Sequence, residues 1–368
     1  MADKQRYYCS FMIIALLAGV AFFRSNDYDS NSDETQDRQT IATEATDSKT
    51  IKTAAPVAGR VYASGEPIGI YIKTRGVLVL GTQQVKSSDN QITSPSKHKL
   101  KSGDYILEMN GKEISSKKEL QSLLQKNGDQ EIVLTIWRNG EKIKMKLHPV
   151  YSEKNQCYQI GAWIRNDTQG IGTVTYIKEN GEFAALGHGI NDSDLGVHLD
   201  ISFGRVYETN IATIMKGKAD NPGELIGSIE YIPENYLGNI TSNTDAGIFG
   251  TIRKNQSQFK KGDLLETAKA SEVKKGKAYL RTSISGKSKD YTIEIEKIMK
   301  NKKDSQKSLQ IRVTDPDLIA LTGGIVQGLS GSPIIQDGEL VGAVTHVLVN
   351  DPTRGYGIFI ENMLEAAG

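Results

Sequence analysis

The residue best suited to chemistry is a serine in a glycine-rich loop near the carboxyl end. The segment reads Gly328-Leu-Ser-Gly-Ser-Pro333, and its glycines allow a sharp turn that exposes the Ser330 hydroxyl. The same turn aims backbone amides at one point, where they can stabilise a negatively charged oxygen. The amides of Gly328 and Ser330 are the candidates for this oxyanion hole. A glycine-rich β-turn with an incidental serine is the alternative, and Ser332 is a weaker nucleophile candidate.

A serine nucleophile needs a base, and the chain has only five histidines. His188 lies in Ala185-Leu-Gly-His-Gly-Ile190, at the end of an expected strand and between two glycines. That position would hold an exposed imidazole tightly. His346 is the runner-up base, because it follows the Ser330 loop by one strand. The remaining histidines are interpreted as surface or buried structural residues: His98, His148 and His198.

An aspartate that orients the base must lie partly buried beside it. Asp192 is too near His188 in sequence to be preferred. Asp315 precedes Pro316 and ends an expected strand close to the Ser330 loop. Spacing alone leaves seven candidates open: Asp167, Asp192, Asp194, Asp200, Asp245, Asp315 and Asp317.

Short strands between tight turns are expected throughout the region from about 151 to 368 that carries these residues. Turn signals such as Asn180-Gly181 and Asp337-Gly338 separate apolar runs. No alternation of strands and helices occurs, so an all-β barrel or paired barrels are expected, with one closing helix at Glu361–Ala366. The expected strands are Gly172–Ile177, Glu182–Leu186, Glu224–Ile232, Gly247–Ile252, Ala278–Ile284, Tyr291–Ile298, Leu309–Val313 and Leu340–Val349.

A smaller α+β module is expected upstream, between residues 61 and 150. Ser116-Lys-Lys-Glu119 is a capping box that starts a helix, and Asn139-Gly140 is a hairpin turn. The run Gly103-Asp-Tyr-Ile-Leu-Glu-Met-Asn-Gly111 resembles the PDZ domains of bacterial periplasmic proteases. The resemblance implies that a peptide end adds as a strand beside Ile70–Lys73, with its carboxylate held by the backbone amides of Ile68, Gly69 and Ile70.

The amino terminus carries a membrane signal. Lys4 and Arg6 precede the apolar run Phe11–Phe23, and the whole segment reaches about 17 residues, the lower limit for crossing a bilayer. The charge places the amino end in the cytoplasm and the rest outside. A retained anchor over residues 1–24 is favoured over a cleaved signal peptide. Residues 25–60 lack large apolar side chains over most of their length and are expected to form a disordered tether.

Composition excludes several classes of protein. Lys and Arg number 45 against 44 Asp and Glu, so a strongly basic nucleic-acid binder is not expected. The only cysteines are Cys9 and Cys157, which exclude a disulfide scaffold and a Cys-rich zinc site. No His-Glu-x-x-His motif occurs, which argues against a metalloprotease. No cofactor and no metal are expected.

Four motifs occur in order along the chain: Gly170–Tyr176, Ala185–Ile190, Thr322–Ile334 and Gly342–Thr353. The serine loop resembles the nucleophile loop of trypsin-like proteases, and through these four motifs the chain as a whole resembles the SpoIVB serine peptidases of endospore-forming bacteria. The resemblance implies that His188, Asp315 and Ser330 are catalytic, in the chain order of trypsin-like enzymes. It also implies a peptidase domain over residues 151–368, and hence a mainly β chain with a membrane anchor and a PDZ-like domain.

The same resemblance implies a signalling role between the forespore and the mother cell. The protein would cleave itself in the tether, within roughly Thr40–Arg60, and then cut an inhibitory membrane protein. That cut would free an intramembrane metalloprotease to process the precursor of sigma factor K. The alternatives are a non-enzymatic PDZ adaptor and an envelope chaperone that binds peptide ends without cleaving them. An esterase is not expected, because a Pro-containing β segment follows Ser330 where the esterase elbow needs a helix.

Overall fold

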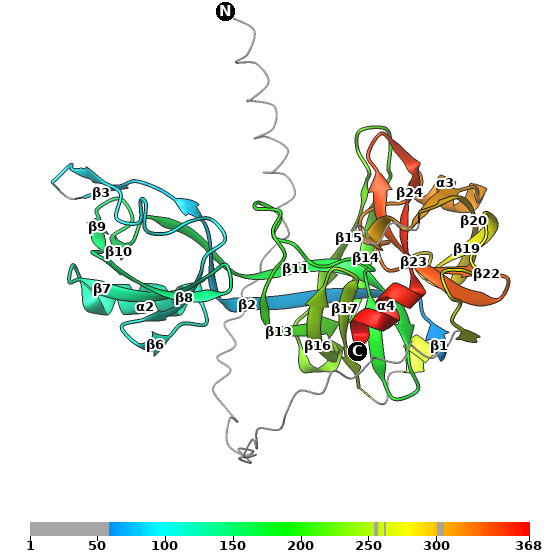
Figure 1. Cartoon of the computed structure of the whole chain (residues 1–368). Helices are drawn as coiled ribbons and strands as arrows, with labels where there is room; N and C mark the ends of the chain where they lie inside the picture. Colours follow the sequence, from blue (N-terminus) through cyan, green and yellow to red (C-terminus); the bar gives the residue numbers. More distant parts are fainter. Residues whose placement is uncertain (1–58, 88, 254–256, 261–262, 300–304) are drawn as a thin grey trace, which may run out of the picture. The chain divides into compact units, whose positions relative to one another are not determined.

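This computed structural model describes residues 59–87, 89–253, 257–260, 263–299 and 305–368 (Figure 1). The predicted anchor and nearly all of the predicted tether lie outside these ranges. None of the helices within them reaches the length and apolarity that a bilayer crossing requires. The described part of the chain is mainly β, as the sequence predicts.

Six of the described strands pair into a closed ring, the first barrel. Each strand is antiparallel to the next, and the last pairing, between β11 and β2, closes the ring. Apolar side chains from several of these strands fill the interior, among them Ile68, Phe183, Leu237 and Ile248. The ring runs β2 (Pro67–Thr82), β13 (Ile201–Tyr207), β16 (Tyr236–Thr244), β17 (Gly247–Ile252), β12 (Glu182–Ala185) and β11 (Ala162–Ile177).

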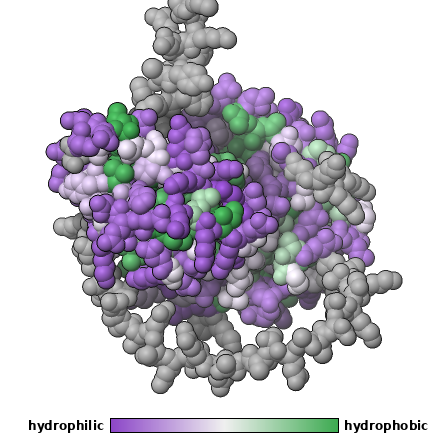
Figure 2. Space-filling view, turned by 60° about the vertical axis from the view of Figure 1, so that its left-hand side comes forward, coloured by the Kyte–Doolittle hydropathy of each residue, from purple (hydrophilic) through white to green (hydrophobic). Residues whose placement is uncertain are grey.

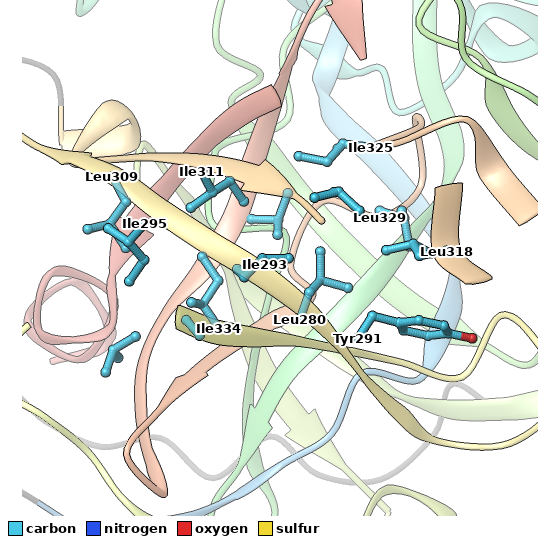
Figure 3. Packing of buried hydrophobic residues seen from close by; sticks show 14 of the residues in the cluster. Leu280, Tyr291, Ile293, Ile295, Leu309, Ile311, Leu318, Ile325, Leu329 and Ile334 are labelled. Carbon is cyan, nitrogen blue, oxygen red and sulfur yellow. The ribbon is translucent and has the colours of Figure 1, made fainter. Parts of the chain in front are cut away.

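A second closed barrel follows in the chain. Its strands alternate inward and outward side chains, as in the burial pattern of Leu309–Val313, and the inward ones form the core that Figure 3 shows, with Leu280, Ile293 and Ile334 at its centre. The paired-barrel expectation is thereby confirmed. The ring runs β19 (Gly276–Thr282), β20 (Lys289–Ile298), β21 (Leu309–Val313), β24 (Asp351–Phe359), β23 (Glu339–Leu348) and β22 (Pro333–Gln336).

Several smaller elements accompany the two barrels. The expected closing helix is α4 (Ile360–Ala367), and an additional short helix, α3 (Pro316–Thr322), leads from β21 into the serine loop. The hairpin of β14 (Thr209–Met215) and β15 (Glu224–Ile229) pairs with no other strand among the described residues. The rest are β1 (Arg60–Ala63), β18 (Leu264–Glu266), η1 (Pro233–Asn235), η2 (Ser257–Lys260) and η3 (Ser305–Lys307).

The PDZ-like module has its own core around the predicted helix, α2 (Lys117–Asn127). The Ser116 hydroxyl accepts the Glu119 amide at 3.1 Å, while the Glu119 carboxylate accepts the amide of Ser115 rather than that of Ser116. The helix is therefore capped as the sequence predicts, with the reciprocal bond shifted by one residue. The strands of the module are β3 (Val85–Lys86), β4 (Ile92–Thr93), β5 (Tyr105–Met109), β6 (Lys112–Glu113), β7 (Ile132–Arg138), β8 (Glu141–Leu147), β9 (Val150–Ser152) and β10 (Cys157–Gln159).

The amino-terminal half of β2 belongs to the first barrel, and this contradicts the predicted peptide site at Ile68, Gly69 and Ile70. Ile70 pairs with Gly170 of β11 on one edge and with Val206 of β13 on the other. Ile68 and Ile70 are 0% and 4% exposed. A peptide can add only to a strand edge with free backbone groups, so the prediction is wrong. The carboxyl-terminal half of β2 pairs with β5 and β11 and serves the PDZ-like module.

The surface contrasts with these cores. Figure 2 shows one face of the molecule covered mostly by hydrophilic residues, with apolar residues in small separate patches. Scattered exposed apolar residues of this kind are ordinary for a folded chain.

Candidate active site

The serine loop follows α3 and turns sharply before β22. Gly324, Gly328 and Gly331 adopt φ values of +136°, +101° and +95°, which favour glycine strongly. At Gly331 a Cβ atom would lie 2.0 Å from the carbonyl oxygen of Thr173 in β11. The sequence places glycines here because the loop needs left-handed turns and packs directly on the backbone of β11.

Ser330 is only partly buried at the tip of this loop. Its hydroxyl donates a hydrogen bond of 2.8 Å to the carbonyl of Thr345 in β23. Ser332, the weaker nucleophile candidate, is fully buried and is therefore not placed to meet a substrate.

His188 follows β12 after two residues with positive φ, Leu186 at +72° and Gly187 at +69°. Its Nδ1 lies 2.9 Å from the carbonyl oxygen of Gly189. Because a carbonyl only accepts, Nδ1 carries the proton and Nε2 keeps its lone pair. Burial lowers the pKa of His188, since it disfavours the charged imidazolium more than the Gly189 hydrogen bond favours it. A neutral imidazole with a free Nε2 is the form that a general base requires.

The two candidate side chains converge on one short stretch of β23. The His188 ring lies 5.1 Å from the ring of His346, centroid to centroid. The neighbouring residue, Thr345, accepts the Ser330 hydroxyl, and a Cβ atom on Gly187 would lie 3.1 Å from its methyl group. His346, the runner-up base, therefore belongs to the same site.

The proposed oxyanion amides can be checked against the hydrogen bonds of the loop. The amides of Leu329, Gly331 and Ser332 donate to the carbonyls of Val326, Val344 and Leu329, at 3.1, 2.8 and 3.0 Å. Within the described residues no protein acceptor is found for the other two amides, those of Gly328 and Ser330. These are the two amides that the sequence nominates, and they are free to bind an oxyanion.

Asp315 lies elsewhere, at the start of α3. One of its carboxylate oxygens accepts the amides of Asp317 and Leu318 at 3.0 and 3.3 Å, and the other accepts the amide of Thr292 at 3.1 Å. No hydrogen bond joins it to His188 among the parts of the chain that the structure describes. Its carboxylate acts here as a helix N-cap.

Several of the other candidate aspartates contact basic residues away from His188. Asp192 and Asp194 both pair with Arg165. The further pairs are Asp200 with Arg75, Asp245 with His198 and Asp317 with Lys289, and Asp167 accepts the Asn166 side chain. Across the described ranges, no group of three or more His, Cys, Asp or Glu side chains gathers as metal ligands would.

Sequence reasoning missed two threonines of the site. Thr345 supplies the carbonyl that accepts the Ser330 hydroxyl. Thr173 bonds the carbonyl of Gly328 through its hydroxyl at 2.8 Å. Only position could have revealed them, since Thr173 stands in the Gly170–Tyr176 motif but a strand threonine is ordinary by type.

Comparison with known families adds two matches. A model of the SpoIVB peptidase S55 family matches residues 156–364, which is more than half of the chain. A PDZ domain model matches residues 94–138.

Solved structures to which the chain is similar include proteases and a PDZ domain. The Rv3671c protease from M. tuberculosis, in its active form, is 15% identical, with 55% of this chain and 75% of that chain covered and a TM-score of 0.32. The HtrA-type protease AlgW with a decapeptide is 10% identical over 83% and 64% of the two chains, with a TM-score of 0.32. The PDZ domain of the SdrC-like protein from Listeria monocytogenes is 17% identical over 25% and 90%, with a TM-score of 0.21.

These identities and TM-scores are low, so the family model is what establishes the relationship. It spans both the His188 loop and the Ser330 loop. The chain belongs to the SpoIVB peptidase S55 family and is a serine peptidase that carries a PDZ domain.

Proposed function

We propose that Ser330 is the nucleophile and His188 the general base of this peptidase. The observation that carries the proposal is the convergence of the Ser330 hydroxyl and the His188 ring on Thr345 and His346. In the resting structure the hydroxyl donates to Thr345. The proposal requires the hydroxyl to leave Thr345 and donate to Nε2 of His188 instead.

The reaction follows from this pair. His188 Nε2 takes the hydroxyl proton as the oxygen of Ser330 attacks the peptide carbonyl carbon. The amides of Gly328 and Ser330 hold the oxyanion. The proton then passes from His188 to the leaving amine, and an acyl-enzyme remains. Water, deprotonated by His188, attacks this ester, and His188 returns the proton to the Ser330 oxygen as the acid is released.

Asp315 is proposed by sequence as the third catalytic residue, and this stays a prediction. The steps above need a base with a fixed tautomer, which the Gly189 carbonyl already provides at Nδ1. An orienting role for Asp315 would require its carboxylate to leave the cap of α3.

The proposed biological role is that of a membrane-tethered signalling peptidase in endospore formation. The protein would act in the space between forespore and mother cell and cleave a membrane inhibitor, so that an intramembrane metalloprotease processes pro-sigma-K. Membership of the SpoIVB family supports this proposal. The proposal includes self-cleavage within roughly Thr40–Arg60, in the predicted tether.

Mass spectrometry of the full-length chain in detergent tests the catalytic assignment. The wild type, Ser330→Ala and His188→Ala proteins are incubated alone. Release of tether fragments by the wild type only supports the assignment, and the cut site gives a first specificity. A Ser330→Ala protein that shortens in pure form refutes self-cleavage by Ser330. If all three stay whole, a serine-reactive phosphonate that fails to label Ser330 would refute the nucleophile.

A second proposed function is the binding of peptide ends by the PDZ-like module, at a new location. The first residues of β11, Ala162–Arg165, pair with β2 on one edge. On the other edge, β11 meets a described partner strand only from Val174 onward. Helix α2 contacts residues just before and just after this stretch: the Gln125 side chain donates to the Tyr158 carbonyl in β10 and the Lys117 amide donates to the Asn166 side chain, each at 3.2 Å.

A free strand edge beside a helix is the arrangement to which an extended peptide adds. Hydrogen–deuterium exchange distinguishes this edge from the position predicted by sequence. Addition of a peptide with a free carboxylate should slow exchange at Ala162–Arg165, and the same peptide with an amidated end should protect less. Protection that appears only elsewhere would contradict the new location.

A further inference from the structure

We propose that Thr173 of β11 is the positioning residue of the oxyanion hole. It fixes the peptide planes around the Ser330 amide and thereby keeps that amide turned toward the substrate. This inference rests on the proposed function of Ser330 as the nucleophile.

All three polar groups of Thr173 are used by the two catalytic loops. The residue is 0% exposed. Its hydroxyl donates to the Gly328 carbonyl at 2.8 Å, and its amide donates to the Ser330 carbonyl at 3.0 Å. Its own carbonyl accepts the amide of Leu186 at 3.2 Å, two residues before His188. One buried residue therefore joins the nucleophile loop to the loop of the base.

The two peptide planes that Thr173 holds lie on either side of the plane that carries the Ser330 amide. The Ser330 amide belongs to the rigid peptide plane between Leu329 and Ser330. The planes before and after it carry the Gly328 and Ser330 carbonyls, the two oxygens that Thr173 holds. The middle plane is held directly by its own Leu329 carbonyl, which accepts the Ser332 amide at 3.0 Å. The two Thr173 bonds anchor the planes on either side to β11 and so fix the direction in which the Ser330 amide points.

The conformational freedom of Gly328 makes the hydroxyl bond important. A glycine at φ +101° has access to many other conformations, so the plane that follows Gly328 depends on its hydrogen bonds. Its Leu329 amide donates to the Val326 carbonyl within the loop at 3.1 Å, and the Thr173 hydroxyl is the contact that ties the same plane to β11. The plane that precedes Gly328 is held independently, since its Gln327 carbonyl accepts the amide of Leu225 at 2.9 Å.

Thr175 provides a matched control on the same strand. It is also 0% exposed, and its hydroxyl donates to the Gly331 carbonyl at 2.8 Å. Residues i and i+2 of a strand share a face, so both threonines face the loop. The Gly331 carbonyl, however, lies in a plane that does not adjoin the Ser330 amide. The two hydroxyls differ in position along the loop and not in burial or bond length.

The test compares Thr173→Val, Thr173→Ser and Thr175→Val with the wild type on a peptide ester and on its thionoester. Valine keeps the shape and removes the hydroxyl, whereas serine keeps the hydroxyl. We expect Thr173→Val to lower kcat for the ester by about 10- to 100-fold, somewhat less than the loss of an oxyanion donor itself, with KM nearly unchanged. Thr173→Ser should restore most of kcat, and Thr175→Val should lower it less than tenfold.

The thionoester gives a readout that a purely structural role would not move. Sulfur accepts hydrogen bonds weakly, so the ratio of ester to thionoester rates reports the oxyanion amides. This ratio should fall in Thr173→Val and stay at the wild-type value in Thr175→Val. Equal ratios in both variants, or a wild-type kcat in folded Thr173→Val, would overturn the inference. If valine prevents folding, Thr173→Ala removes the same hydroxyl and is judged by the same ratio. Hydrolysis by Ser330→Ala would instead overturn the proposed function itself.

Discussion

Replacing Asp315 separates a helix cap from an orienting carboxylate. In Asp315→Ala the amides of Asp317 and Leu318 lose their cap, and the Thr292 amide loses its acceptor. Asp315→Asn keeps one oxygen for the cap and puts an amide group where the Thr292 amide needs an acceptor. If Asp315 acts only as the cap of α3, both variants lose stability before they lose activity, and the alanine variant loses more stability than the asparagine variant.

The expected losses of stability and of kcat distinguish a helix cap from an orienting carboxylate. Loss of an N-cap costs about 1 kcal/mol, and an orphaned amide costs a further ~1–3 kcal/mol. Asp315→Ala should therefore lose about 2–4 kcal/mol, which corresponds to roughly 5–15 °C in Tm. Loss of an orienting aspartate costs about 10⁴-fold in kcat with the fold intact. A cap leaves the kcat of the folded enzyme within about tenfold, since native chains hold about 5–15 kcal/mol in reserve.

Calorimetry and steady-state kinetics on the same preparations measure both quantities. Asp317→Ala is the matched control, because Asp317 lies in the same first turn of α3 but pairs with Lys289 at 2.7 Å and caps nothing. An Asp315→Asn enzyme with wild-type Tm and a 10⁴-fold lower kcat would refute the capping argument and establish Asp315 as the third catalytic residue.

Three further predictions follow from other contacts. Because burial lowers the pKa of His188, the base stays neutral to lower pH. The midpoint of the acidic limb in the pH profile of kcat/KM should therefore lie below the ordinary histidine pKa of about 6.5. A midpoint above that value would contradict the burial argument. Arg138→Met should destabilise the PDZ-like module by about 3–5 kcal/mol, because Arg138 donates two bonds of 2.6 Å to Asp104, whose side chain is 1% exposed; an unchanged melting curve would count against this ion pair. Gly331→Ala should abolish self-cleavage, because its Cβ would meet a β11 carbonyl at 2.0 Å, whereas Gly140→Ala, at φ +86° with open space around it, should retain it.

Local sequence patterns predicted the parts of the site that local backbone chemistry creates. Glycines around Ser330 and His188 predict sharp turns that expose side chains, and both turns are present. The strand Gly247–Ile252 and the strand Leu309–Val313 were predicted with their observed bounds. Alternating apolar residues between turns are sufficient for such assignments.

Long-range strand pairing explains why the peptide site predicted at Ile68–Ile70 is wrong. The Pro-Ile-Gly-Ile pattern looks the same whether its strand edge is free or covered. Its partners lie about a hundred residues or more further along the chain, in β11 and β13, and no local signal reveals them. The position of Asp315 was different, because Asp followed by Pro is itself a helix-start signal. A helix of seven residues directly after a strand gives little periodic signal, so α3 was not predicted.

The hydrogen bond from Ser330 to Thr345 limits how strongly the resting structure can suppress catalysis. A bond of this kind contributes about 0.5–1.5 kcal/mol, so it can slow attack by only about two- to tenfold. The proposed signalling role would need a far less active resting state than this bond provides. Any other donor that binds the Thr345 carbonyl releases the Ser330 hydroxyl, so freeing the nucleophile requires little free energy. Under that proposal, tight control would come from access to the site rather than from the resting rotamer of its nucleophile.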